Sequence, residues 1–272
     1  MHDVQIGRRH RKMARTWNEL TGEQLLQVCR IYGKDFNLRA LLHRAMLGVL
    51  LQVPARVLRK INHVQVLELK PFYRFLLEPD QGRPLTAQLL PRLPVRSWRQ
   101  AFFAPTLYGP ADSFRNLSFS EFIFADTYFL RYLQTTEEAA LDKLVAVLYR
   151  PQRRDYNPLA VSYGGDRRED FNEHLLAARA RHVARVPHYV KFAVLLYYRG
   201  CRRELERRYA RVFEGDTNRK AALSGWQAVL HGLADGVHRI DATAQQRLHN
   251  VMREMQRVLE NYDRAKEAQQ ST

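Results

Sequence analysis

Side chains that could bind a metal ion or perform catalysis are few in this sequence, and their spacing favours neither chemistry. His174, His182 and His188 follow one another at eight and six residues, so they do not place a metal-ligating pair on one helical face. Cys29 and Cys201 lie far apart in apolar segments, which predicts buried thiols rather than a disulfide or a metal site. No phosphate-binding loop, dinucleotide glycine motif or nucleophile elbow is present. The sequence therefore predicts no metal, no cofactor and no catalytic residue.

Asp126 lies within a segment rich in aromatic residues, where a carboxylate could have a raised pKa suited to proton transfer. An isolated acid of this kind more often pairs with a basic side chain or caps a neighbouring segment. Arginine is abundant here and accounts for 36 of the 44 basic residues. We therefore predict that Asp126 has a structural role of this kind, and that the protein is not an enzyme.

Four arginines, Arg199, Arg203, Arg207 and Arg211, recur at every fourth residue and would form a basic ridge on one face of a helix. Together with the formal net charge of +16, this ridge makes a polyanion such as nucleic acid a candidate ligand. The opposing interpretation is an ordinary solvated helix, because Glu204 is spaced for the i,i+4 ion pair that stabilises such helices. The signatures of specific nucleic-acid-binding modules are missing from the sequence. Nucleic acid is therefore the alternative partner rather than the first choice.

Apolar residues at helical spacing run through most of the chain and predict the elements that carry these side chains. We expect helices over residues 22–32, 36–53, 64–77, 119–133, 137–150, 171–184, 188–213, 219–234 and 244–267. Pro71 must start, kink or split the third of these helices. No convincing alternation typical of strands is seen. The sequence therefore predicts an all-α fold, a bundle of several helices.

Polar residues at the predicted helix starts support these assignments. Thr21-Gly-Glu-Gln24 and Ser118-Phe-Ser-Glu121 both have the spacing of a capping box, in which the two side chains bond each other's backbone N–H groups. Thr136 and Thr243 are the expected caps of the helices that follow them. The helices on either side of Thr136 should form a hairpin.

A stretch rich in proline divides the predicted helices into two groups. Six prolines fall between residues 78 and 110, with Trp and Phe side chains interleaved, which indicates a connector that packs down. We predict a basic mobile tail over residues 1–15, an amino-terminal helical subdomain over 16–95, the connector over 96–117 and a carboxy-terminal helical domain over 118–267.

Two segments are candidate surfaces for a protein partner: the aromatic segment Phe114–Tyr132 and the amphipathic helix Thr243–Tyr262. A helix that is aromatic on most faces is either buried or bound to a partner. The candidate partner-binding residues are Phe114, Phe119, Phe122, Phe124, Tyr128, Tyr132, Leu248, Met252, Met255 and Leu259. The alternative is that both apolar strips pack into the protein's own core.

Hydropathy predicts a protein without membrane spans, because no apolar run approaches the roughly 20 residues that a spanning helix needs. The basic residues near the start are followed by the polar stretch TWNELTGEQ rather than by an apolar signal core. We therefore expect a cytoplasmic protein.

Three blocks of sequence, LYGPADSFRNLSFSEFIFAD, LVAVLYRP and YYRGCRRELERRYARVF, resemble uncharacterised helical proteins encoded in prophages and tailed-phage-like gene clusters. The resemblance covers residues 105–260 and includes no catalytic motif. It implies a tail-assembly accessory protein or chaperone that binds phage structural or tail proteins, in the cytoplasm or incorporated into a phage-like particle. No functional residue is carried over from this family.

Overall fold

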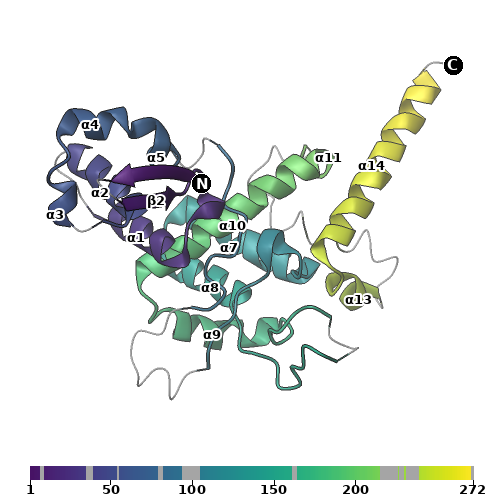
Figure 1. Ribbon diagram of the computed structural model, residues 1–272. Helices are drawn as coiled ribbons and strands as arrows, with labels where there is room; N and C mark the ends of the chain where they lie inside the picture. The colour runs from purple at the N-terminus through teal and green to yellow at the C-terminus, as the bar shows by residue number, and fades with distance from the viewer. Residues whose placement is uncertain are drawn as a thin grey trace. The chain divides into compact units, whose positions relative to one another are not determined.

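The computed structural model describes residues 1–6, 9–34, 39–53, 55–78, 82–93, 105–160, 164–214, 226, 230 and 239–270. These residues are mostly helical, with one two-stranded sheet, so the all-α prediction is confirmed (Figure 1). The contacts divide the chain into two compact units, Met1–Leu89 with His188–Gly200, and Leu90–Pro187 with Cys201–Thr272. The segment His188–Gly200 thus groups with the amino-terminal residues, whereas the sequence placed it in the carboxy-terminal domain.

The first unit contains a hairpin and a group of helices. Its elements are β1 (His2–Ile6), β2 (Arg9–Met13), the 3-10 turn η1 (Trp17–Glu19), α1 (Gly22–Tyr32), α2 (Arg39–Leu51), α3 (Ala55–Leu58), α4 (His63–Glu68), α5 (Lys70–Leu77) and the first part of α10 (His188–Arg208). The capping box of α1 is confirmed, since Thr21 Oγ1 accepts from Gln24 N at 3.2 Å and Gln24 Oε1 accepts from Thr21 N at 2.9 Å. Pro71 lies in the first turn of α5 and separates it from α4, as a proline in this pattern requires.

The predicted mobile tail is wrong over the two strands. β1 and β2 pair in antiparallel register, with His2 opposite Met13 and Ile6 opposite Arg9. Met13 and the following Ala14 are buried, and β2 lies against α2, so packing on the unit's core orders a segment that is polar in sequence. Sequence pattern missed the hairpin because its second strand is almost entirely basic.

The second unit is built around a helical hairpin. Its elements are the 3-10 turn η2 (Asp112–Phe114), α7 (Phe119–Thr135), α8 (Glu138–Leu148), the 3-10 turn η3 (Glu173–Leu175), α9 (Leu176–Val183), the end of α10, α11 (Ala210–Phe213), α13 (Ile240–Ala244) and α14 (Leu248–Gln270). α7 packs along α8, which confirms the predicted hairpin, and α9 packs on α8 in turn (Figure 1).

Two of the predicted caps are wrong. Thr136 has a left-handed conformation, with φ of 55°, and ends α7 by donating its N–H to Tyr132 O at 2.8 Å. Thr243 lies inside α13, and α14 begins only at Leu248, whose N–H donates to Leu117 O at 2.9 Å. The helix predicted over 219–234 lies outside the described residues, apart from Trp226 and Leu230.

None of the helices that the structure describes combines the length and the apolar character needed to cross a membrane. Cys29 and Cys201 are buried thiols that are not joined in a disulfide, as predicted. Burial raises the pKa of the Cys29 thiol to about 12, so this cysteine is neutral and unreactive at physiological pH.

Candidate functional site

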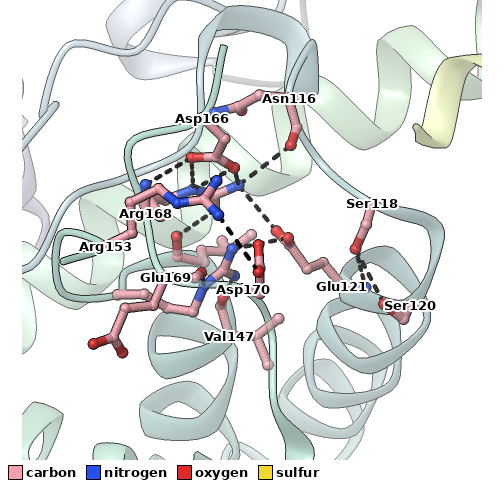
Figure 2. A network of polar contacts seen from close by, with 12 residues as sticks. Asn116, Ser118, Ser120, Glu121, Val147, Arg153, Asp166, Arg168, Glu169 and Asp170 are labelled. Atoms are coloured by element: carbon pink, nitrogen blue, oxygen red, sulfur yellow. Dashed lines mark hydrogen bonds and ion pairs between the residues drawn. The ribbon is translucent and has the colours of Figure 1, made fainter. Parts of the chain in front are cut away.

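The first turn of α7 carries a buried carboxylate that the sequence assigned to helix capping. Ser118 Oγ accepts from Glu121 N at 3.2 Å, so half of the predicted capping box is present. The carboxylate of Glu121 accepts from Arg150 at 2.8 Å and from Arg168 at 3.0 Å (Figure 2). All three side chains are buried. Glu121 is therefore the centre of an ion-pair network rather than a cap.

Backbone carbonyls and a second acid complete this network. Arg150 donates to the carbonyl oxygens of Val147 and Glu169, both at 2.7 Å. Arg168 donates to Asp166 at 2.7 Å, and to the carbonyl oxygen at the end of α8 at 2.8 Å (Figure 2). Two guanidinium groups thus balance two carboxylates inside the unit, as buried charges require.

Burial and charge pairing act in opposite directions on the two arginines. Burial lowers the pKa of Arg150, and the neighbouring Glu121 only partly opposes this. Burial also lowers the pKa of Arg168, but Glu121 and Asp166 together outweigh it and raise that pKa above its ordinary value. The contacts with two acids therefore hold Arg168 firmly in its charged form.

The network connects three parts of the second unit that are distant in sequence. Glu121 comes from α7, Arg150 follows α8, and Arg168 belongs to the loop before α9. Backbone pairing reinforces the assembly, because Arg150 exchanges two hydrogen bonds with Tyr108 at 2.8 and 3.1 Å. Since both carboxylates already accept several hydrogen bonds, this geometry suits structural support rather than proton transfer.

Asp126 forms the ion pair with arginine that is typical of such an acid. Its carboxylate is fully buried, with one oxygen 2.5 Å from Arg202 Nε and the other accepting from Trp226 Nε1 at 3.1 Å. Arg202 also contacts Glu206, one turn further along α10. The acid therefore joins α7 to α10 and to Trp226.

Three of the six aromatic residues proposed for partner binding are in the core. Phe114, Phe119 and Phe122 are buried, and Trp226 packs edge-on against Phe122 with ring centroids 5.2 Å apart. The others on α7 are partly covered: Phe124, Tyr128 and Tyr132. For Phe114, Phe119 and Phe122 the alternative of packing in the protein's own core therefore holds, because these rings supply the packing of the second unit.

The apolar stripe of α14 divides into a buried part and an exposed part. Leu248, Met252 and Met255 are buried, so these three are not a free partner surface, and Leu259 is half-buried. The same stripe continues to Val258, which is 49% exposed, and to Tyr262, which is 67% exposed. Apolar spacing in the sequence predicts the stripe but does not indicate where its packing ends.

The four arginines of the predicted ridge do not follow one continuous helix. α10 ends at Arg208, Tyr209 has non-helical dihedral angles, and Arg211 lies on α11. Arg207 pairs with Glu204 at 2.8 Å, and Arg211 pairs with Asp263 of α14 at 2.7 Å. The other two, Arg199 and Arg203, lie on α10, half-buried and exposed respectively. Carboxylates of the chain itself thus offset part of the ridge.

In the described part of the chain, no cluster of three or more histidine, cysteine, aspartate or glutamate side chains is arranged to hold a metal ion. No family model, curated protein or solved structure matches this chain. The resemblance to prophage proteins therefore stays a prediction, and the functional argument rests on the geometry of the chain itself.

Proposed function

We propose that this protein is a non-enzymatic component that binds other proteins during assembly of a phage or phage-tail-like particle. One observation carries the proposal: the apolar stripe of α14 continues beyond the protein's own core onto Val258 and Tyr262. The phage particle as the setting rests on the resemblance of residues 105–260 to prophage-encoded proteins.

The geometry of α14 suits binding in a groove of a partner. Leu248 and Met252 anchor the start of the helix in the second unit, and every side chain from Arg264 to Gln270 is exposed. Val258, Leu259 and Tyr262 then follow the i,i+1,i+4 pattern of one helical face, the arrangement by which amphipathic helices dock into apolar grooves. A single exposed apolar residue is ordinary, but a continuous extension of a buried stripe favours a binding surface.

The surroundings of the buried acids support a function without catalysis. Glu121 and Asp126 are both buried among arginine side chains and accept hydrogen bonds from them. A general acid or base needs access to a substrate and a proton that it can exchange. Neither carboxylate has that access in this arrangement.

The alternative, a basic nucleic-acid-associated protein, rests on the net charge of +16. Its contacts would be the ridge residues Arg199, Arg203, Arg207 and Arg211, of which Arg207 and Arg211 are paired with carboxylates of the chain. A polyanion would have to displace these acids, which favours weak and salt-sensitive binding.

The experiment that tests the proposal is purification of the tagged full-length protein from its native host after nuclease treatment, at low and moderate salt, with mass spectrometry of what copurifies. We expect particle or tail proteins to copurify with the wild type. They should no longer copurify with a Val258→Asp, Tyr262→Asp double variant. Arg264→Ser is the matched control, because Arg264 is exposed on another face of the same helix. Circular dichroism should be equal for all three proteins.

Two outcomes would contradict the proposal. Loss of every copurifying partner on nuclease digestion would favour the nucleic-acid alternative. Recovery of the same particle proteins by the double variant would remove α14 as the binding element.

A further inference from the structure

α4 and α5 follow one another in the first unit (Figure 1), and some of their apolar side chains are exposed rather than packed in its core. α4 begins with a capping box, in which Asn62 Oδ1 accepts from Gln65 N at 2.8 Å. Val66 is buried on the inner side of this helix, whereas Val64 is 63% and Leu67 is 44% exposed. The helix is therefore held by one face and leaves an apolar face outside.

The apolar face continues from α4 into α5. Val64, Leu67 and Pro71 have the i,i+3,i+7 spacing of a single helical stripe, and Pro71 is also exposed. Leu69, between the two helices, keeps right-handed helical dihedral angles of −80° and −5°. We call these three residues, Val64, Leu67 and Pro71, the α4–α5 strip.

Basic side chains are in excess over acidic ones in the segment that contains the strip. Residues 55–78 contain five arginines and lysines and two glutamates. Arg74 and Glu78 form an ion pair within this segment, at 2.8 Å. The remaining basic residues are Arg56, Arg59, Lys60 and Lys70, and no carboxylate in the part of the chain that the structure describes forms an ion pair with them. The region therefore has an excess of positive charge beside its apolar strip.

We propose that the α4–α5 strip binds an acidic amphipathic helix of a partner protein. The i,i+3,i+7 spacing of its apolar side chains matches the apolar seam of a helix, and the lysines would face glutamates beside that seam. Charge complementarity of this kind sets orientation and speeds encounter. The proposal rests on the proposed function in that the partner is a protein, and adds a second surface, on the other unit from α14.

Lysines flank the strip along the chain and indicate where the acids of the partner belong. Lys60 lies in the turn before α4, four residues ahead of Val64, and Lys70 follows Leu67 by three residues. Glu68 also lies beside the strip and would pair with one basic residue of the bound helix. An acidic helix with a single basic residue next to its seam is thus the best complement.

A lipid membrane is the competing ligand for a surface that is both basic and apolar. Glu68 stands beside the strip, where it would repel anionic headgroups, and the partly exposed aromatic ring next to it, Phe72, packs edge-on against His2 rather than extending outward. α4 is also short, at six residues, so it offers little area for insertion. These features favour a protein helix.

The test uses the full-length protein and two synthetic, side-chain-bridged helical peptides with fluorescent labels. One has leucine at the seam and glutamate on the flanks, and the other has lysine in place of each glutamate. By fluorescence anisotropy we expect saturable binding of the acidic peptide, weakened by salt, and none of the basic peptide. Leu67→Asp should weaken this binding by about tenfold or more, because it places a charge on an exposed apolar position that the bound peptide would cover.

Matched variants separate this surface from others. Leu133→Asp introduces the same change at an exposed leucine of α7 in the second unit, and should leave peptide binding unchanged. The double variant at Val258 and Tyr262 should also bind the peptide normally, so failure of the proposed function and failure of this surface are distinguishable. Lys60→Glu with Lys70→Glu is a second route to the same loss, should Leu67→Asp unfold.

Three outcomes would overturn the proposal. These are equal binding of both peptides, unchanged binding by the Leu67→Asp and double-lysine variants, and binding to phosphatidylserine vesicles that depends on Leu67 in the absence of peptide binding. The last result would assign the strip to a membrane surface.

Discussion

The two ends of α7 carry the same kind of contact, a glutamate paired with arginine, in opposite surroundings. At the first turn, Glu121 is buried and meets two buried arginines. Near the other end of α7, Arg131 contacts Glu137, which lies just after the helix, at 3.0 Å. Both side chains are about half exposed. The distances are similar, so distance alone does not separate the two contacts.

Burial decides what each contact contributes. Removing one partner of a buried pair leaves a charge without solvent or counter-charge, whereas water and salt replace the partner of an exposed pair. The first end of α7 should therefore control stability and the last end should hardly affect it. Substitutions at buried and exposed positions should show that difference, from the largest effect to the smallest.

Glu121→Gln should have the largest effect on stability. The substitution keeps the shape of the side chain but leaves Arg150 and Arg168 with one carboxylate between them. We expect the free energy of unfolding to fall by about 3–5 kcal/mol. Urea denaturation followed by circular dichroism measures this change. A loss below about 1 kcal/mol, the range of exposed pairs, would mean that the network is solvated in solution.

Asp126→Asn should have the next largest effect. Arg202 would lose its buried counter-charge, but its side chain is 13% exposed and retains Glu206, so relaxation toward water is easier than for Arg168. We expect a loss of about 2 kcal/mol, the cost of a charged hydrogen bond with partial compensation. Thermal unfolding monitored by tryptophan fluorescence measures it. A loss equal to that of Glu121→Gln would contradict the ranking by burial.

The helices and the role of Asp126 could be predicted because their signals are local or general. A capping residue, a proline or an apolar stripe acts within a few residues, and Thr21 and Pro71 act as predicted. The pairing of Asp126 follows from the cost of burying a lone charge. These rules need no knowledge of what lies across the fold.

The partners of Glu121 could not be predicted, because they are 29 and 47 residues away among 36 arginines. The capping-box spacing was a local signal that a long-range contact overrode. The end of α10 near Tyr209 has neither proline nor glycine to indicate it, so one ridge was predicted where two helices occur. On α4 and α14, likewise, the spacing of apolar residues does not distinguish a buried face from an exposed one.

His249 should make a smaller contribution to stability, one that depends on pH. Its Nε2 contacts Ser113 O at 2.8 Å and its Nδ1 contacts the Tyr209 hydroxyl at 3.1 Å. Burial lowers the pKa of His249, the hydrogen bond to Ser113 opposes this, and the charges of Arg208 and Arg253 lower it further. Folding therefore favours the neutral ring. The neutral His249 ring therefore contributes its full stabilisation at a pH above about 6.5, the pKa of histidine in the unfolded chain. This stabilisation is lost as the pH falls through the lowered pKa of the folded state.

Unfolding free energies at several pH values between neutral and mildly acidic measure this effect. The wild type should lose more stability on acidification than a His249→Gln variant, which can still donate to Ser113 O. Ser113 has a left-handed φ of 51°, so this hydrogen bond also holds an unfavourable backbone conformation. Identical pH profiles for the two proteins would assign the loss to other groups, such as His43, whose pKa burial also lowers.

Glu137→Gln should have the smallest effect, although it removes the contact that most resembles that of Glu121. Glu137 is the residue before α8, but its side chain makes no capping hydrogen bond, so the neutral amide loses only the exposed pair with Arg131. We expect a change within about 0.5 kcal/mol of the wild type, by the same urea titration. This variant is also the control for Glu121→Gln, because both remove one negative charge from the same helical hairpin. A comparable loss in the two variants would mean that net charge, rather than burial, sets the stability of the second unit.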